Sequence, residues 1–234
     1  MAEFMTTAFW VAVGQIILID ILLGGDNAVV IALACRGLPP KQRKLGIIYG
    51  TMGAIILRVV LIAFALALLA IPYLKLVGGV LLVWIGVKLL MPHDDDDHSN
   101  ISANDKLWGA VKTVIVADLV MSVDNVLAIA GAAQGAGQAH QLPLVIFGLL
   151  VSIPIIVAGS QIVLKLMDRF PIIITLGAML LGWIAGQMIY TDPGLKDWLP
   201  ASKTWEYAMA AGGALLVLAL GKLLQARKKP EAAA

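Results

Sequence analysis

Two acidic residues interrupt the first long apolar stretch of the chain, residues 16–32 (IILIDILLGGDNAVVIA). A carboxylate at the centre of a bilayer costs roughly 2.5–3.5 kcal/mol, so Asp20 and Asp26 are expected to face protein or water and to have partners. Gly24 and Gly25 weaken the helix just before Asp26, and unwound backbone at membrane depth is tolerated only where it lines a cavity or packs against protein. The stretch predicts an interrupted helix with a cation site; a simple salt bridge to another helix is the alternative.

Composition places the chain in a membrane. Its 234 residues are 60% hydrophobic and 14% charged, with a mean hydropathy of +0.92, more apolar than a soluble domain needs. A helix that crosses a hydrocarbon core of about 30 Å needs roughly 20 residues. We therefore predict an all-α, polytopic membrane protein with seven transmembrane helices, over residues 8–35, 46–71, 73–91, 109–133, 142–164, 171–190 and 206–225.

The first of these spans is expected to be retained in the protein. A signal peptide has a positively charged leading region and a short apolar run, whereas this segment opens with Glu3 and contains two acids. The chain has one cysteine, Cys35, which excludes an intramolecular disulfide and a cysteine-rich metal site.

The chain resembles itself at a spacing of 98 residues. Residues 16–32 align with residues 114–130 (VIVADLVMSVDNVLAIA), so that both segments contain the pattern D-x5-D-N. Asp20 falls on Asp118, Asp26 falls on Asp124, and Asn27 falls on Asn125. Packing alone would favour Leu or Ala at such positions, so the repeated acids indicate a shared chemical role.

Each half of the repeat contains three predicted helices. One transmembrane domain, residues 1–230, is expected to comprise repeat 1 (about 8–91), an acidic cytoplasmic loop (92–106), repeat 2 (about 109–190) and a seventh helix (about 206–225). Because three spans separate equivalent points, the two halves are expected to cross the membrane in opposite directions. Inverted repeats of this kind place their site near the midplane, at the interface between the halves.

The two Asp-Asn motifs are the predicted metal ligands. Asp26 and Asp124 are expected to approach one another at mid-depth and to hold a divalent cation. The remaining oxygens are expected from Asn27, Asn125 and backbone carbonyls freed at Gly24 and Gly25. On an intact helix Asp20 would lie about 120° from Asp26, so Asp20 and Asp118 are expected to form a second layer or a proton relay.

Arg58 lies midway along the second predicted span, in AIILRVVLIAF. A buried guanidinium needs an acidic partner, and Asp20 or Asp118 is the expected one. Arg58 then either keeps that acid ionised, competes with a bound cation, or acts as a structural clamp.

A run of four aspartates flanked by histidines, residues 93–98 (HDDDDH), falls in the acidic loop. It could gather divalent cations, although such a run more often serves as a solvated linker. The sequence contains no Ser/His/Asp arrangement, aromatic-lined basic groove or ATP-binding motif. We therefore expect neither an enzyme nor a nucleic-acid-binding protein, and no resident cofactor.

The paired segments GGDNAVVIA (24–32) and SVDNVLAIA (122–130), in a seven-span chain with an acidic loop, resemble the TerC family of integral membrane proteins. The resemblance covers essentially the whole chain. It implies kinship with LysE-type exporters, a link to manganese export and an association with tellurium resistance. Carried over to this sequence, it implicates Asp26, Asn27, Asp124 and Asn125.

The sequence thus predicts a secondary transporter that exports a divalent metal cation, Mn²⁺ first. Exchange for protons is one coupling that the paired acids allow. A small-solute or amino-acid exporter of LysE type and a non-transporting scaffold in tellurium or metal stress are the alternatives. The metal ion and the lipid bilayer are the expected partners, and the oligomeric state stays open.

The distribution of basic residues predicts an inner (plasma) membrane protein with its N-terminus outside and its C-terminus in the cytoplasm. Thirteen of the 17 Lys and Arg residues lie in the first, third and fifth connections and the C-terminal tail, against three on the opposite side. Single cysteines placed between the first two spans should therefore react with an impermeant reagent only from the cytoplasmic side. Labelling of these cysteines from outside would reverse the topology.

Overall fold

The computed structural model describes the chain except for residues 1–6, 65–70, 92–102, 135–140, 197 and 229–234. Its described part is all-helical, which confirms the predicted fold class. It contains seven α-helices and one 3-10 helix: α1 (Thr7–Cys35), α2 (Pro40–Ala63), α4 (Leu74–Leu90), α5 (Ala103–Gln134), α6 (Gln141–Arg169), α7 (Ile172–Tyr190), η3 (Pro193–Leu195) and α8 (Lys203–Lys228).

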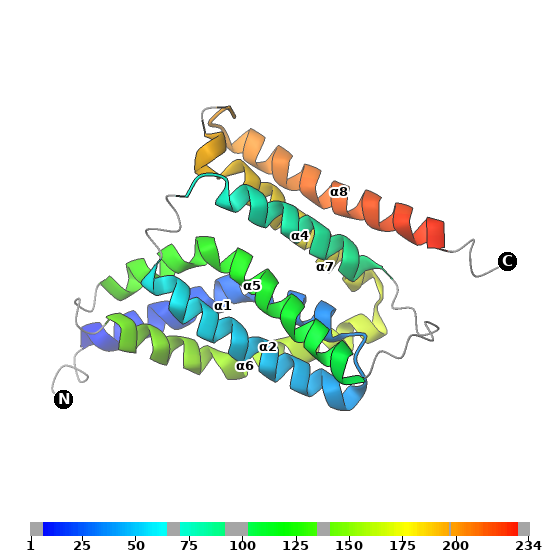
Figure 1. The fold of residues 1–234 in the computed structure, drawn as a ribbon. Helices are drawn as coiled ribbons and strands as arrows, with labels where there is room; N and C mark the ends of the chain where they lie inside the picture. The colour runs from blue at the N-terminus through cyan, green and yellow to red at the C-terminus, as the bar shows by residue number, and fades with distance from the viewer. Residues whose placement is uncertain (1–6, 65–70, 92–102, 135–140, 197, 229–234) are drawn as a thin grey trace.

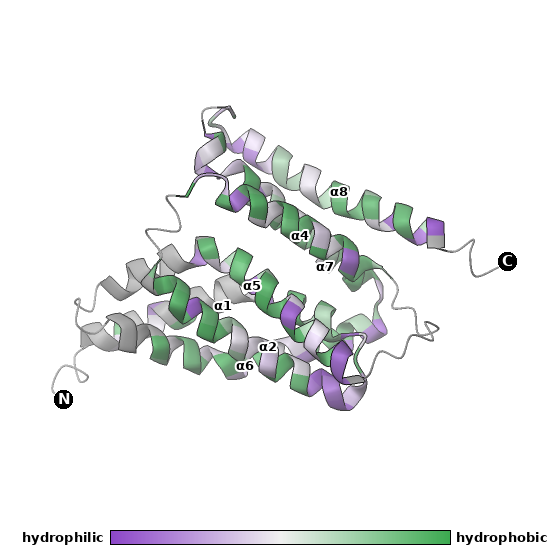
Figure 2. Cartoon of the chain, in the orientation of Figure 1, coloured by the Kyte–Doolittle hydropathy of each residue, from purple (hydrophilic) through white to green (hydrophobic). Residues whose placement is uncertain are grey.

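Four segments of the described chain are long and apolar enough to cross a membrane by length and composition. They are Pro40–Ile62, Ile146–Arg169, Ile172–Tyr190 and Lys203–Arg227. Figure 2 shows that hydrophobic residues dominate the middle of the helices and that hydrophilic residues gather toward their ends. This is the pattern of helices whose centres lie in hydrocarbon and whose ends reach water.

Two helices begin earlier than hydropathy predicts. α2 begins at Pro40 rather than residue 46, and α5 begins at Ala103 rather than residue 109. Hydropathy detects only the apolar part of a helix, whereas the helix itself continues through the polar interface. Proline in the first turn of α2 suits a helix start, because its missing N–H would have no helical partner there.

The helices form two groups (Figure 1): α1, α2, α5 and α6 lie together, and α4, α7 and α8 lie beside them. Within these groups α1 packs on α6, α2 on α5, and α4 on α7. At the repeat spacing, α1 corresponds to α5, α2 to α6, and α4 to α7. The first helix of each half therefore packs on the second helix of the other half, a reciprocal pairing that a two-fold relation between halves would produce. The membrane orientation of the halves stays a prediction.

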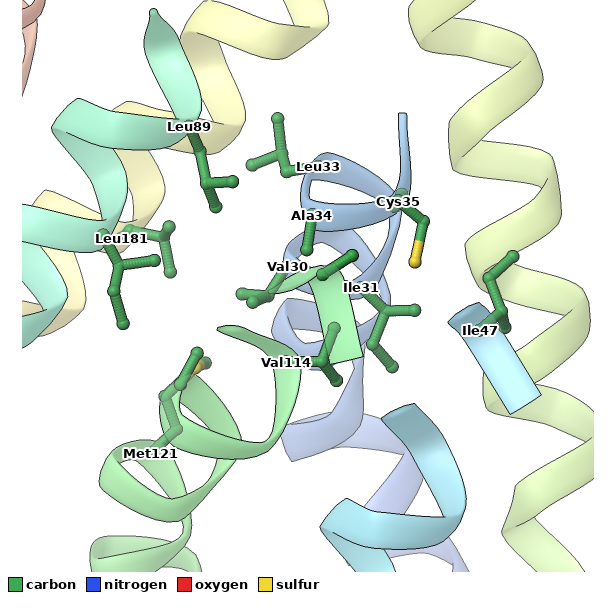
Figure 3. Close-up of a cluster of buried hydrophobic side chains, with 14 of the residues drawn as sticks. Val30, Ile31, Leu33, Ala34, Cys35, Ile47, Leu89, Val114, Met121 and Leu181 are labelled. Atoms are coloured by element: carbon green, nitrogen blue, oxygen red, sulfur yellow. The ribbon is translucent and has the colours of Figure 1, made fainter. Parts of the chain in front are cut away.

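A buried apolar cluster joins the two groups. It includes Val30 and Ile31 of α1, Val114 of α5, Leu89 of α4 and Leu181 of α7, as Figure 3 shows. The cluster fixes the first helices of both halves against the α4–α7 pair.

The seventh helix, α8, is held against α7 by glycines. A Cβ added at Gly182, Gly186 or Gly213 would collide with backbone of the facing helix. Small residues let helix backbones approach closely in membranes, where lipid competes with every other apolar contact.

The predicted break at Gly24-Gly25 is wrong, because α1 runs unbroken from Thr7 to Cys35. Two glycines weaken a helix by about 1 kcal/mol each relative to alanine. A backbone group left without a hydrogen bond in hydrocarbon costs several kcal/mol, so the apolar surroundings favour the intact helix. The carbonyls of the glycine pair are therefore not freed as cation ligands.

Asp192, which sequence analysis did not single out, joins α7 to the start of α4. It follows α7, is only 1% exposed, and accepts backbone N–H groups from Tyr73 (2.9 Å), Leu76 (2.9 Å) and Gly194 (2.7 Å). The first turn of a helix leaves N–H groups without helical partners. The Asp192 carboxylate accepts hydrogen bonds from such groups at α4 and η3. Burial alone would raise the pKa of Asp192, but the N–H groups of Leu76, Tyr73 and Gly194 outweigh it and lower the pKa.

We expect Asp192→Asn to destabilise the protein by about 1–3 kcal/mol at neutral pH, because an amide cannot accept all three N–H groups. The depressed pKa makes this contribution fully present above the unfolded-state pKa of about 3.9 and lost as the pH falls through the lower folded-state value. Thermal unfolding of parent and variant over a pH series should show the gap closing toward acid. A gap that widens in acid would contradict this account; Asp168→Asn, an exposed acid, is the control.

Candidate functional site

An ion pair lies buried between α2 and α5. Arg58 Nη2 lies 2.5 Å from Asp118 Oδ1, and the two side chains are 3% and 6% exposed. Ser122 connects them: its Oγ accepts from Arg58 Nε (3.1 Å) and donates to Asp118 Oδ2 (3.0 Å). Of the two acids expected near Arg58, Asp118 lies beside it, and the side chain of Asp20 lies outside the described residues.

Burial makes this network costly to break. Taking charges out of water is expensive, and removing one member of a buried pair typically costs about 3–5 kcal/mol because the other charge stays unpaired. Each oxygen of Asp118 already has a donor, Arg58 on one side and Ser122 on the other. An ionised carboxylate has about four lone-pair sites, so a cation that binds Asp118 competes with the positive charge of Arg58 rather than with a filled set of donors.

Asn27, in the first Asp-Asn motif, differs from Asp118 in its hydrogen bonding. It is 3% exposed, and neither Oδ1 nor Nδ2 has a hydrogen-bond partner among the residues that the structure describes. A buried amide without a partner costs about 1–3 kcal/mol, so it calls for an explanation. Asp26, the preceding residue, is half-buried, and Gly25 is exposed. The motif thus combines a carboxylate with an open, buried amide.

Two contacts at Gly46 relate the levels of α1, α2 and α5 in the bundle. A Cβ at Gly46 of α2 would lie 3.0 Å from Cys35 Sγ of α1 and 3.4 Å from Leu107 Cδ1 of α5. The three helices therefore share one level there. Arg58 is twelve residues after Gly46 and Asp118 eleven after Leu107, about 18 and 16 Å along their helices, and they are in contact as this register requires.

The same measurement applies to α1. Its residues before Cys35 lie progressively farther from the Gly46 level. Asn27 and Asp26 are eight and nine residues before Cys35, about 12 and 14 Å away, close to the depth of Asp118. Asp124 is seventeen residues after Leu107, about 26 Å away. The neighbour of Asp26 in depth is thus Asp118. The predicted approach of Asp26 to Asp124 stays a prediction, since the Asp124 side chain lies outside the described residues.

The other predicted site residues are only partly described. Asp20 and Gly24 lie within α1 and Asp124 within α5, but their side-chain surroundings lie outside the described residues; Asn125 is half-buried. The acidic run 93–98 also lies outside them. Within the described residues there is no group of three or more His, Cys, Asp or Glu side chains that could hold a metal ion.

Thr51 of α2 is a second buried polar residue that sequence analysis did not mark. It is 1% exposed, and its Oγ1 has no hydrogen-bond partner in the described structure. A threonine in an apolar helix usually bonds to a carbonyl of its own helix, so its sequence context carries no signal of an open hydroxyl.

The fold and the buried charges define the class: a membrane-embedded, polytopic helical protein with ionisable groups inside its bundle. The chain belongs to the integral membrane protein TerC family, whose family model matches residues 5–229. This finding confirms the resemblance that the paired Asp-Asn motifs carry.

Several curated membrane proteins are similar to this chain. The uncharacterized membrane protein YjbE of Bacillus subtilis is 43% identical over 188 residues, covering 80% of this chain and 83% of its own length. The uncharacterized membrane protein YceF of the same organism is 27% identical, covering 76% and 70%. The UPF0053 protein YegH of Escherichia coli is 24% identical over 92% of this chain but only 42% of its own length. No solved structure matches.

The contrast between Ser122 and Asn27 predicts opposite effects on stability. Ser122→Ala removes the two hydrogen bonds through which Ser122 bridges Arg58 and Asp118, leaves their direct contact in place, and should destabilise the protein by about 1–3 kcal/mol. Asn27→Leu replaces an amide without partners by an apolar group of similar size, and it should leave the melting temperature unchanged or raise it. Thermal unfolding of the purified variants measures both effects. A loss in Asn27→Leu equal to that in Ser122→Ala would mean that the amide is already satisfied.

Proposed function

We propose that this protein is a secondary transporter that exports a divalent metal cation, Mn²⁺ first, from the cytoplasm. The observation that carries the proposal is the open, buried amide of Asn27 beside the carboxylate of Asp26. Ionisable residues inside membrane bundles are costly and usually belong to substrate pathways. Membership of the TerC family supports a membrane role for the whole chain.

The chemistry of the donors favours a hard cation. Carboxylate and amide oxygens suit Mn²⁺, Mg²⁺ and Ca²⁺, whereas Zn²⁺ and Cu⁺ prefer imidazole or thiolate. Neither Asp-Asn motif has a histidine or cysteine beside it. We assign Mn²⁺ within this group because the paired motifs resemble those of a family linked to manganese export.

The four acids of the two repeats, Asp20, Asp26, Asp118 and Asp124, are the proposed route for the cation and for protons. Asp124 and Asn125 repeat Asp26 and Asn27, and we assign them to the same pathway as the second motif. The sequence has no ATP-binding motif, so an ion gradient or the membrane potential is the proposed energy source. Two protons that enter as one divalent cation leaves would make the exchange electroneutral. We place the protein in the plasma membrane with its C-terminus in the cytoplasm.

One contact weighs against the amino-acid exporter. A zwitterion needs a cation for its carboxylate, and Arg58 is the intramembrane arginine that sequence analysis offered for this role. Its Nη2 is engaged by Asp118 and its Nε by Ser122. The scaffold alternative differs in another way, because it predicts that the Asp-Asn acids can be neutralised without loss of function.

Neutralising either acid should abolish export. We expect Asp26→Asn and Asp124→Asn each to reduce Mn²⁺ efflux from loaded proteoliposomes by about 100-fold or more, because each removes a carboxylate from the proposed cation pathway. Asp168→Asn is the matched control: it removes an acid that is 56% exposed and pairs with Arg43 at the surface, and efflux should stay at the parent rate.

Efflux at the parent rate in both motif variants would rule out the proposed site and favour the scaffold. Efflux by the parent should also rise when protons are supplied on the side to which the metal leaves. Indifference to an imposed pH gradient would leave the cation site standing and remove proton exchange.

A further inference from the structure

Three helices of the bundle place charged and polar groups at one depth. Measured from the Gly46 level, Asp26 and Asn27 of α1, Asp118 of α5 and Arg58 of α2 fall within about 6 Å along the bundle. α5 packs on both α1 and α2, so it lies between the two groups. Figure 3 shows Val30 and Ile31 of α1 near Val114 of α5 in the buried apolar cluster.

The polar groups on the two sides of this layer differ in their hydrogen bonding. Asp118 accepts from Arg58 at one oxygen and from Ser122 at the other, whereas the Asn27 amide has no partner in the described structure. A buried layer with one occupied carboxylate and one open amide is incomplete as a purely structural device. This arrangement is expected where a cationic side chain pairs with a carboxylate that a mobile cation binds during transport.

We propose that Arg58 is a tethered counter-cation of the transport site: the substrate cation binds Asp26, Asn27 and Asp118 in one layer by taking Asp118 over from the guanidinium. This inference rests on the proposed function. It makes Arg58 a positioning residue that sets affinity and release, and it makes Asp118 a ligand rather than a proton relay.

The charges of the layer support this exchange. With Arg58 in place, Asp26 and Asp118 leave one net negative charge, and a divalent cation added to them would leave one net positive charge inside the bundle. When the cation replaces the guanidinium at Asp118, the cation and the two carboxylates are neutral together. By helical rise, Asp20 on α1 lies about 22 Å from the shared level, within about one helical turn of the depth of Arg58.

The second half of the repeat does not reproduce this arginine. At the 98-residue spacing Arg58 corresponds to Ile156, which is buried and apolar. The tethered cation therefore belongs to one of the two motif layers. Such an asymmetry suits a transporter that has to release its substrate on one side of the membrane.

The test is Mn²⁺ binding to the full-length purified protein, by calorimetry and by the rise in melting temperature that Mn²⁺ produces. Arg58→Gln removes the competitor, so the Kd for Mn²⁺ should fall about tenfold and the Mn²⁺-induced rise should exceed that of the parent. Export should slow, because nothing displaces the cation. Arg58→Lys keeps the charge but loses the planar fork, and its Kd should fall about threefold.

Two further variants separate this role from a structural clamp. Arg58→Gln with Asp118→Asn removes both charges together, and it should bind Mn²⁺ at least about tenfold more weakly than Arg58→Gln alone. Arg43→Gln breaks an arginine–aspartate pair of 3.0 Å at the surface, and its Kd should equal that of the parent.

The outcomes distinguish the two proposals. If the parent binds and exports Mn²⁺ while Arg58→Gln and Arg58→Lys keep the parent Kd, Arg58 is a clamp and the inference is overturned. The same holds if the double variant binds Mn²⁺ as tightly as Arg58→Gln alone. If the parent neither binds nor exports Mn²⁺, the proposed function itself is wrong and the inference falls with it.

Discussion

The buried contact of Arg58 with Asp118 and Ser122 is the interaction on which the rest of this bundle depends. In hydrocarbon an unpaired guanidinium or carboxylate costs several kcal/mol, so α2 and α5 can pack only in the register that joins these groups. That register fixes the depth of every other residue on α5 relative to α2. Through Gly46 it also fixes the depth of α1, and so the level at which Asp26 and Asn27 lie.

The other polar groups of the bundle make Asn27 stand apart. Ser152 and Ser160 of α6 are fully buried, and each donates to a carbonyl of its own helix, 2.8 and 2.9 Å away. At the end of α7, Asp192 serves backbone N–H groups of α4 and η3. In the described part of the chain, Asn27 shares the lack of a partner with the Thr51 hydroxyl and with Gln42 Oε1, but of these three only Asn27 lies in the repeated acidic motif, where a cation would supply what its amide lacks.

The sequence predicted the helices well and the side-chain partners less well. Long apolar segments directly predict membrane-spanning helices, because a helix is the simplest structure that satisfies its own backbone hydrogen bonds in lipid. The same physics overturned the predicted break at Gly24-Gly25, since the apolar surroundings keep α1 intact there. Charge balance predicted an acidic partner for Arg58, Asp20 or Asp118, but showing that Asp118 is in contact with it needed the packing of α2 on α5.

Asp192 could not have been found from its neighbours in the sequence. An acid after an apolar helix usually indicates a solvated loop, and its partners Tyr73 and Leu76 are more than a hundred residues away. The left-handed backbone of Tyr73 (φ 64°), rare for a side chain of this size, belongs to the same junction. Contacts of this kind depend on which helix ends meet, and that is a property of the whole fold.

The most direct test of the account is to locate a bound cation. Crystals of the protein grown with Mn²⁺ and measured for anomalous scattering should show one peak between α1 and α5, at the depth of Asn27 and Asp118, with oxygen ligands about 2.2 Å away. Arg58 should have moved from Asp118 in that structure. A peak only at the acidic run 93–98, with Arg58 still bound to Asp118, would contradict a transport site inside the bundle.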